Sequence, residues 1–278
     1  MNISVSADIA GKDYEKLFRL CEGLNINELV LFLNQELYDL ENNILSENLL
    51  NKKIRILKNG GLNVSVVQFP LLPSRIFLDE TSDEIKALCT NIRILADLGI
   101  KTAVIFPWPE ASGNPERDKK QWDRFIQTYS HLVNTAEDSG LRLATHGHRL
   151  QKYLLADCNS YKNLFKALPS LSNGFTFCMG CLYYTGDSFK RCIMELKDRI
   201  FLVHVRDLVK KNVNEEIEEV PLGEGEVNII EGIKALKNIN YNGLLFVEHI
   251  PQIPWEGNNE LLAQVQAIGF IKALLKDK

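Results

Sequence analysis

Short runs of apolar residues recur along the chain, and polar segments separate them. Each run is about four to eight residues long, which is typical of a buried β-strand. Such runs occur in parallel sheets, whose strands are covered on both faces. We therefore predict eight strands, at residues 3–7, 28–33, 63–69, 102–107, 141–146, 175–180, 200–205 and 244–250.

Segments between these strands carry apolar residues at helical spacing. Residues 82–98 open with Ser-Asp-Glu, which suits a helix N-terminus, and stop before Gly99. Residues 13–21, 47–58 and 118–139 show similar patterns. The alternation of strand and helix predicts a parallel sheet with helical crossovers. Eight such units within 278 residues predict an α/β fold, a single (β/α)₈ TIM barrel in one domain spanning residues 1–278.

A doubly wound open sheet is the alternative architecture. It would place a glycine-rich phosphate-binding turn after the first strand, and residues 7–11 contain no G-x-G-x-x-G. Two segments after strands are expected to be long loops on the carboxyl face of the barrel, residues 106–115 and 209–225. The acidic run at residues 215–219 is interpreted as a solvated loop.

Composition and charge narrow the classes of function. The chain is 45% hydrophobic and 24% charged, an ordinary globular composition, and its net charge of −4 argues against nucleic acid and anionic membrane surfaces. No apolar run reaches about 18 residues, so no membrane span is predicted. The N-terminus shows no signal-peptide pattern, and the six scattered cysteines are expected to be reduced. We therefore expect a cytoplasmic protein.

Metal-binding residue types stand at the ends of the last four predicted strands. His146, Cys178, His204 and Glu248 each follow an apolar run, and the strand ends of a barrel surround one pocket. The set predicts one divalent metal site, with Mn²⁺ the first choice and Zn²⁺, Fe²⁺ or Co²⁺ as alternatives. His148, two residues beyond His146, competes with it for the role of ligand.

Further polar residues on this face are candidates for catalysis and substrate binding. His249 and His148 are assigned to proton transfer, since histidine titrates near neutral pH. Arg206 and Arg149 are assigned to gripping a carboxylate or phosphate, and Arg206 also to catalysis; Trp108 is assigned to substrate binding. Two alternative roles remain open: the arginines could form salt bridges at the rim of the barrel, and His249 could make a hydrogen bond that supports a neighbouring residue.

Cys178 and Cys181 form a C-x-x-C motif. A redox function would require the first cysteine at a helix N-terminus in a thioredoxin-like unit, whereas Cys178 is predicted to end the sixth strand. A structural zinc site would need a second such pair, which the sequence lacks. The motif therefore favours Cys178 as part of the four-residue metal site.

These residues resemble the xylose isomerase-like TIM-barrel superfamily of sugar isomerases, epimerases and lyases, and within it the mannonate dehydratase branch most. The resemblance implies metal ligands at His146, Cys178, His204 and Glu248, and a proton-transferring histidine at His249. The chain departs from that branch at three places: it has glutamate at Glu248, a different segment at residues 147–151, and no tyrosine at residues 261–269. The resemblance rests on residues 168–180, 199–207, 222–227, 243–251 and 267–274.

The resemblance implies a divalent-metal-dependent enzyme that acts on a small sugar or sugar acid. A mannonate dehydratase-like lyase is the leading hypothesis, and a sugar or sugar-phosphate isomerase or epimerase is the alternative. A barrel that binds metal and sugar without turnover is a third. An apurinic endonuclease shares the fold, but five histidines and a net charge of −4 argue against it. A homodimer stays open, since no helix is diagnostic of one.

Overall fold

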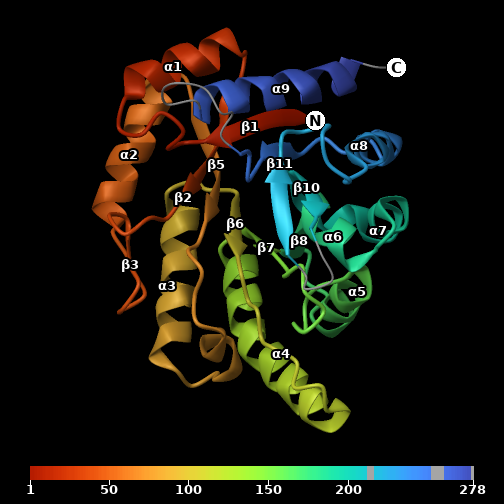
Figure 1. Ribbon diagram of the computed structural model, residues 1–278. Coiled ribbons are helices and arrows are strands. Elements are labelled where there is room, and N and C mark those ends of the chain that lie inside the picture. Colours follow the sequence, from red (N-terminus) through yellow and green to blue (C-terminus); the bar gives the residue numbers. More distant parts are fainter. Residues whose placement is uncertain (212–215, 252–259, 277–278) are drawn as a thin grey trace.

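Eight parallel strands close into a barrel in the computed structural model, which describes residues 1–211, 216–251 and 260–276 (Figure 1). The order around the barrel is β1-β12-β9-β8-β7-β6-β5-β2, so each strand pairs with its neighbours in chain order and the last returns to the first. This confirms the predicted TIM barrel. Its strands are β1 (Asn2–Ser6), β2 (Glu28–Phe32), β5 (Asn63–Gln68), β6 (Thr102–Ile105), β7 (Arg142–Thr145), β8 (Asn173–Cys178), β9 (Ile200–Val205) and β12 (Leu244–Val247).

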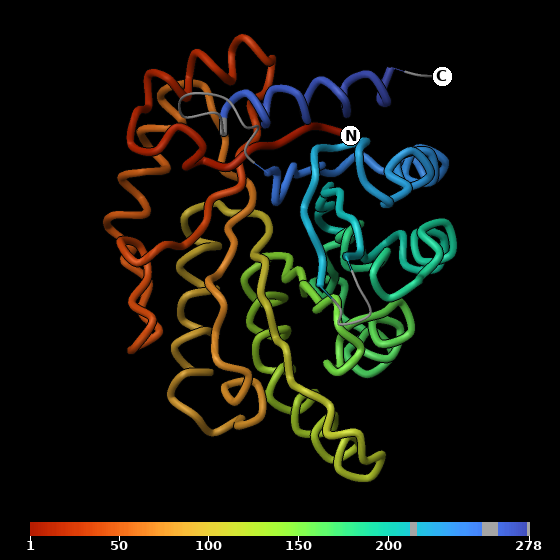
Figure 2. The backbone as a smooth tube through the Cα atoms, viewed as in Figure 1, coloured from red at the N-terminus to blue at the C-terminus, as the bar shows by residue number. Residues whose placement is uncertain are grey.

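Helices surround the barrel, and the last of them lies beside the first strand (Figures 1 and 2). Capping residues set their starts: Ser82 accepts a hydrogen bond from the amide of Ile85, and Asn114 caps the longest helix. The α-helices are α1 (Tyr14–Gly23), α2 (Glu47–Asn59), α3 (Asp83–Asp97), α4 (Pro115–Asp138), α5 (Cys158–Ala167), α6 (Met179–Thr185), α7 (Phe189–Leu196), α8 (Ile229–Asn238) and α9 (Glu260–Lys276), and the 3₁₀ helices are η1 (Ser74–Leu78) and η2 (Lys197–Arg199).

The sequence misplaced two regions. The predicted strand at residues 175–180 ends at Cys178, because Met179 and Gly180 already belong to α6. The predicted loop at residues 209–225 is wrong in part, because β10 (Asp207–Lys210) and β11 (Ile217–Val220) form an antiparallel hairpin. A second small hairpin, β3 (Tyr38–Asp39) with β4 (Ile44–Leu45), was not predicted.

Alternate residues of the strands face the two sides of the barrel wall. One set packs against the helices and forms the large core, as Leu29 and Leu31 do on β2. The other set, which includes Val30, Val66 and Leu202, forms a separate cluster that fills the barrel. Phe106 and Phe246 belong to this inner cluster and also line a cavity above it. The packed barrel therefore supplies a rigid apolar floor for the cavity.

No helix in the described ranges is long and apolar enough to cross a membrane.

Candidate metal centre and surrounding cavity

Four side chains from four neighbouring strand ends meet at the floor of the cavity. One potential ligand atom from each of His146, Cys178, His204 and Glu248 lies within 4.8 Å of the other three. His204 lies on β9, Cys178 ends β8, and His146 and Glu248 directly follow β7 and β12. All four residues are buried. The structure therefore brings together the four residues that the sequence predicted as metal ligands. His148, the alternative to His146, is not in this cluster.

Hydrogen bonding orients the His146 ring toward the cluster. His146 Nδ1 lies 2.7 Å from the carbonyl oxygen of Gly147, so Nδ1 carries the proton and donates it. The lone pair of Nε2 is then free, and Nε2 is buried without a hydrogen-bond partner. The Gly147 amide in turn donates to the Tyr161 hydroxyl at 2.6 Å, which fixes the peptide. Supporting contacts of this kind are typical of histidine that binds a metal.

The nitrogen and oxygen ligand atoms of His204 and Glu248 are also buried without hydrogen-bond partners. Both imidazole nitrogens of His204 and Oε2 of Glu248 are in this state. His204 Nδ1 and Glu248 Oε2 are 2.8 Å apart, yet their directions do not form a hydrogen bond. Buried polar atoms rarely lack partners. Together with the Cys178 thiol, the two imidazoles and the carboxylate fit a divalent transition metal ion better than magnesium or calcium.

Electrostatic coupling within the cluster favours its charged forms. Burial by itself raises the pKa of Cys178, but its polar neighbours Cys181, His146 and His204 outweigh burial and hold that pKa well below its usual value. Burial also acts to raise the pKa of Glu248, while the neighbouring His204 lowers it to about 2. Burial lowers the pKa of His204, and Glu248 and Cys178 raise it to about 9. The thiolate and carboxylate are the forms that bind metal.

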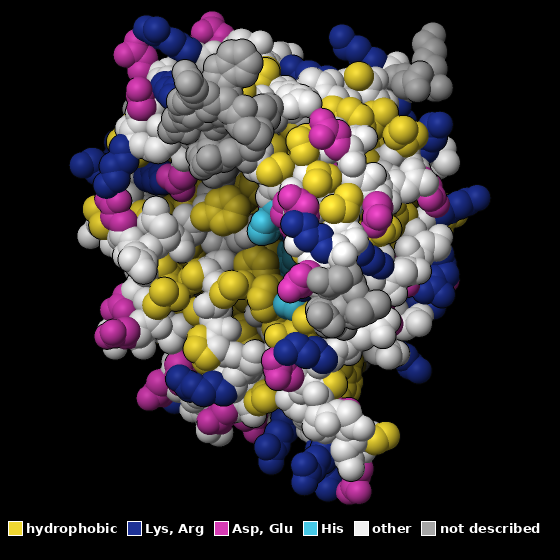
Figure 3. All heavy atoms as spheres, in the orientation of Figure 1, with side chains coloured by type: hydrophobic (Ala, Val, Ile, Leu, Met, Phe, Trp, Pro, Cys, Tyr) yellow, Lys and Arg dark blue, Asp and Glu magenta, His cyan; other side chains and the backbone are white. Residues whose placement is uncertain are grey.

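The cavity above the cluster has a volume of about 640 Å³, which suits a small molecule. In the space-filling view it is a hollow with hydrophobic and histidine side chains on its walls (Figure 3). Among the residues that the structure describes, the charged ones that line it follow the later strands, as does the metal cluster. The lining residues are Ser6, Phe32, Gln68, Phe69, Pro70, Leu71, Phe106, Trp108, His146, Gly147, His148, Arg149, Cys181, Arg206, Phe246, Val247, Glu248, His249 and Gln264.

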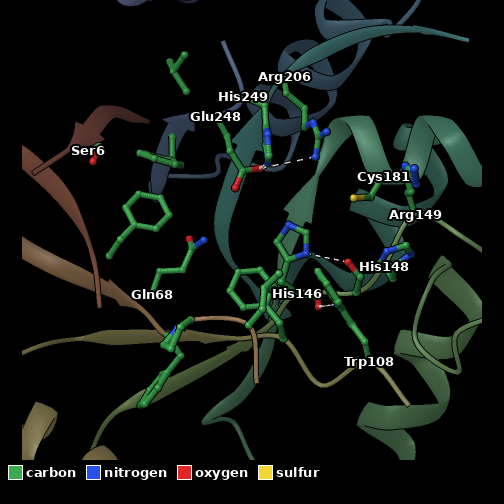
Figure 4. A pocket seen from close by; sticks show the side chains of 18 of the residues that line it. Ser6, Gln68, Trp108, His146, His148, Arg149, Cys181, Arg206, Glu248 and His249 are labelled. Atoms are coloured by element: carbon green, nitrogen blue, oxygen red, sulfur yellow. Dashed lines mark hydrogen bonds and ion pairs between the residues drawn. The ribbon is translucent and has the colours of Figure 1, made fainter. Parts of the chain in front are cut away.

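Arg206 lies on the cavity wall beside the cluster, as its phase with His204 predicted (Figure 4). Its guanidinium forms an ion pair with Glu219, and Nη1 lies 4.0 Å from Glu248 Oε2. The side chain also packs against Gly180, where a Cβ atom would lie 2.7 Å from Arg206 Cγ. These contacts leave the guanidinium in one orientation at the edge of the cavity.

The interpretation of residues 215–219 as a solvated loop is wrong for Glu219. This residue lies on β11, and its side chain is only 22% exposed because it packs against Arg206. Residue 215 lies outside the described residues. The sequence missed Glu219 because an ion pair across a hairpin has no local signature; the acidic run alone gave no sign of it.

Asp207 holds the hairpin to the following turn. The carboxylate is fully buried, and its two oxygens accept hydrogen bonds from the amides of Leu208, Gly223, Gly225 and Val227 at 2.9–3.1 Å. A Cβ atom at residue 225 would lie 2.1 Å from Asp207 Oδ1, so the turn requires glycine there. Asp207 therefore orders the segment that carries Glu219 and, through it, Arg206.

His148 lies in an aromatic setting beside Trp108 on the cavity wall (Figure 4). Its ring centroid is 4.7 Å from that of Trp108 and 4.0 Å from that of Tyr153. Burial, then the charges of Arg149 and Lys152, lower the pKa of His148 to about 4, so the ring is neutral at neutral pH. Its Nδ1 accepts a hydrogen bond from the Leu150 amide at 3.0 Å, which leaves the proton on Nε2.

His249 and Arg149 lie nearer the mouth of the cavity. His249 has a φ of 52°, unusual for a residue other than glycine, and its side chain is 51% exposed. His249 Nε2 is 3.8 Å from Glu248 Oε2. The guanidinium of Arg149 lies over the Tyr184 ring at 5.3 Å. Trp108 donates a hydrogen bond from Nε1 to the His146 carbonyl oxygen at 2.8 Å, so it supports the cluster as well as lining the cavity.

The C-x-x-C motif spans the junction of β8 and α6. Cys178 ends the strand and is also the N-cap residue of the helix, so the sequence argument that separated these two positions does not hold. Cys181 lines the cavity but is not one of the four clustered residues. Both thiols are free.

Comparison with known proteins identifies the family. A family model described as the xylose isomerase-like TIM barrel matches residues 28–274. Mannonate dehydratase from Oceanobacillus iheyensis is 32% identical over 94 residues, which cover 32% of this chain and 26% of that protein. The chain matches less than half of the length of its curated relatives.

Solved structures show the same fold at low identity. Mannonate dehydratase from Streptococcus suis serotype 2 superposes with a TM-score of 0.78 at 15% identity, over 99% of this chain and 93% of that chain. The IOLI protein with a bound zinc atom superposes with a TM-score of 0.76 at 16% identity, over 99% and 98% of the two chains. A divalent metal is thus bound within this fold in a similar structure, although at such identities the likeness shows the fold alone.

Proposed function

The chain belongs to the xylose isomerase-like TIM barrel family, and on that premise we propose that it is a divalent-metal-dependent enzyme of small sugars or sugar acids. The reaction that the site supports best is dehydration of a sugar acid, as in a mannonate dehydratase-like lyase. One observation carries the proposal: buried ligand atoms of His146, Cys178, His204 and Glu248 converge beside a cavity of substrate size.

We assign the metal ion to these four residues, with Mn²⁺ preferred and Zn²⁺, Fe²⁺ or Co²⁺ as alternatives. When bound, the ion would act as a Lewis acid and acidify the C–H bond next to the substrate carboxylate or carbonyl. A set of thiolate, imidazole and carboxylate ligands is compatible with each of these ions, so the ligand set alone does not select among them.

We assign the remaining polar residues of the cavity to substrate binding and to proton transfer. We assign Arg206, which pairs with Glu219, and Arg149 to binding a substrate carboxylate, since both line the cavity. His249 is half-exposed next to Glu248, so it can exchange protons with solvent and act as the general acid and base. His148 carries its proton on Nε2 and is neutral, so we assign it to donating a hydrogen bond to substrate.

Isomerisation or epimerisation is the second candidate. It begins with the same removal of a proton from carbon, and it differs only in whether the proton returns or a neighbouring hydroxyl leaves as water. The dehydratase branch that the sequence resembles has a catalytic tyrosine near the C-terminus, and residues 261–269 of this chain contain none. This difference supports isomerisation or epimerisation as the second candidate. A barrel that binds sugar without turning it over is the third candidate.

A substrate panel tests the proposal directly. Purified protein loaded with Mn²⁺ is incubated with mannonate, its stereoisomers and a set of ketoses. Formation of a 2-keto-3-deoxy acid is expected, and an altered ketose would instead establish the isomerase or epimerase. Binding of a sugar acid without any product after prolonged incubation would establish the binding protein and overturn the enzymatic proposal.

Replacing the proposed proton-transfer residue separates chemistry from binding. His249→Asn is expected to lower kcat by about 100-fold or more, while KM and bound metal stay close to those of the wild type, because His249 is not one of the clustered residues. The matched control is His131→Asn, since His131 is also 51% exposed but lies on α4, away from the cavity. An equal loss in both variants, or none in His249→Asn, would remove His249 from the mechanism.

A further inference from the structure

The two halves of the cavity differ in chemistry. The half that follows β7, β8, β9 and β12 holds the metal cluster and, of the described lining residues, the charged ones Arg149, Arg206 and Glu248. The half that follows β1, β2, β5 and β6 holds no charged lining residue within the described ranges. We call this second half the aromatic wall; its residues are Ser6, Phe32, Gln68, Phe69, Pro70, Leu71, Phe106 and Trp108.

Few polar groups on the aromatic wall are free to meet a ligand. The Ser6 hydroxyl accepts a hydrogen bond from the Asp8 amide, and the Trp108 indole donates to the His146 carbonyl. Gln68 differs from both. It is only 5% exposed, its Oε1 is buried without a hydrogen-bond partner, and its amide projects from the end of β5 toward the open centre of the cavity (Figure 4).

We propose that Gln68 and the aromatic wall select a substrate whose distal end is apolar, uncharged and carries one hydroxyl group for the Gln68 amide. Within the proposed function, on which this inference rests, the substrate class is an unphosphorylated 6-deoxy sugar acid. Its carboxylate end lies at the metal cluster and Arg206, its terminal methyl group packs against Phe32, and the adjacent hydroxyl bonds Gln68.

This assignment follows from the free-energy cost of burying polar groups that have no hydrogen-bond partner. Each substrate hydroxyl that loses water must find a partner in the cavity or weaken binding. Besides the Gln68 amide, the aromatic wall offers the Ser6 hydroxyl, which already accepts a hydrogen bond from the Asp8 amide, and otherwise mainly aromatic and aliphatic surface. A second hydroxyl at the distal end would find only this already bonded Ser6 hydroxyl, and a phosphate dianion would meet no cation there among the described residues. Methyl and ring C–H groups, in contrast, gain contact with the phenyl rings.

The test uses hexonates that differ in configuration at C2 and C3. For each of them it compares three matched forms: the 6-hydroxy acid, the 6-deoxy acid and the 6-phosphate. Turnover is measured with Mn²⁺-loaded protein, and affinity is measured separately by calorimetry. The 6-deoxy form is expected to have a kcat/KM about 10- to 100-fold above that of the 6-hydroxy form, with the 6-phosphate lower still. Affinities should follow the same order.

Two variants locate the selectivity. Gln68→Leu removes the amide and should weaken binding of the 6-deoxy acid about tenfold, through loss of the bond to its distal hydroxyl. Gln264→Leu is the matched control, because Gln264 lines the cavity from α9, outside the aromatic wall, and also has an unpartnered Oε1. It should leave the ratio between the 6-deoxy and 6-hydroxy forms unchanged.

The outcomes separate this inference from the proposed function. Turnover of sugar acids with no preference for the 6-deoxy form, or with preference for the phosphate, overturns the inference and leaves the dehydratase intact. A preference that survives in Gln68→Leu, with undiminished affinity, removes Gln68 from the selection. Absence of both binding and turnover for every form overturns the dehydratase and this inference together.

Discussion

Cys178→Ala is expected to abolish stoichiometric metal binding and, with it, turnover. The thiol is buried within the cluster, and the nearby thiol of Cys181 is not among the four clustered residues. Losing a supporting contact around a metal site costs about 10- to 100-fold in affinity, and losing a ligand should cost more. Metal content after dialysis, measured by plasma emission spectroscopy, should fall from about one ion per chain to near zero.

Cys158→Ala provides the matched control for this experiment. Cys158 is as buried as Cys178, but it begins α5 and is not among the clustered residues. The same loss of volume is therefore made without touching the cluster, and metal content should be unchanged. His204→Ala should behave like Cys178→Ala. Full metal binding in both cluster variants would mean that the ion, if any, binds elsewhere, and the proposed chemistry would have no site.

The residues of the metal cluster could be predicted because their signal is local. An apolar run that ends in a histidine, thiol or carboxylate marks the end of a strand, and the closed barrel brings four such ends together. The sequence could not decide whether His146 or His148 belongs to the metal cluster. That choice depends on the Gly147 carbonyl, which orients one ring, and on the Leu150 amide, which occupies Nδ1 of the other.

The features that the sequence missed depend on contacts between distant segments. The strands β10 and β11 carry charged residues and lie outside the barrel, so they show no buried apolar run. Glu219 pairs with Arg206 only because the hairpin folds back over the strand end. Gln68 ends a correctly predicted strand, yet its lack of a partner is a property of the folded cavity. Each is a tertiary outcome that no periodicity encodes.

Asp207→Ala is expected to destabilise the protein by about 3–5 kcal/mol. The substitution removes a buried acceptor of four backbone hydrogen bonds, and each buried amide left without a partner costs about 1–3 kcal/mol, less where water can enter. Chemical denaturation should show the loss as a lower midpoint. Because the hairpin would loosen, Arg206 should also lose its fixed partner Glu219, and KM for a carboxylate substrate should rise.

Two further variants show whether the hydrogen bonds are responsible. Asp207→Asn keeps one acceptor oxygen in nearly the same volume, so its loss of stability should be about half that of the alanine variant. Glu224→Ala changes an exposed carboxylate in the same turn and should shift stability by about 0.5 kcal/mol or less. If Asp207→Ala were as stable as Glu224→Ala, the turn would hold itself, and the orientation of Arg206 would have to come from Glu219 and the packing against Gly180 alone.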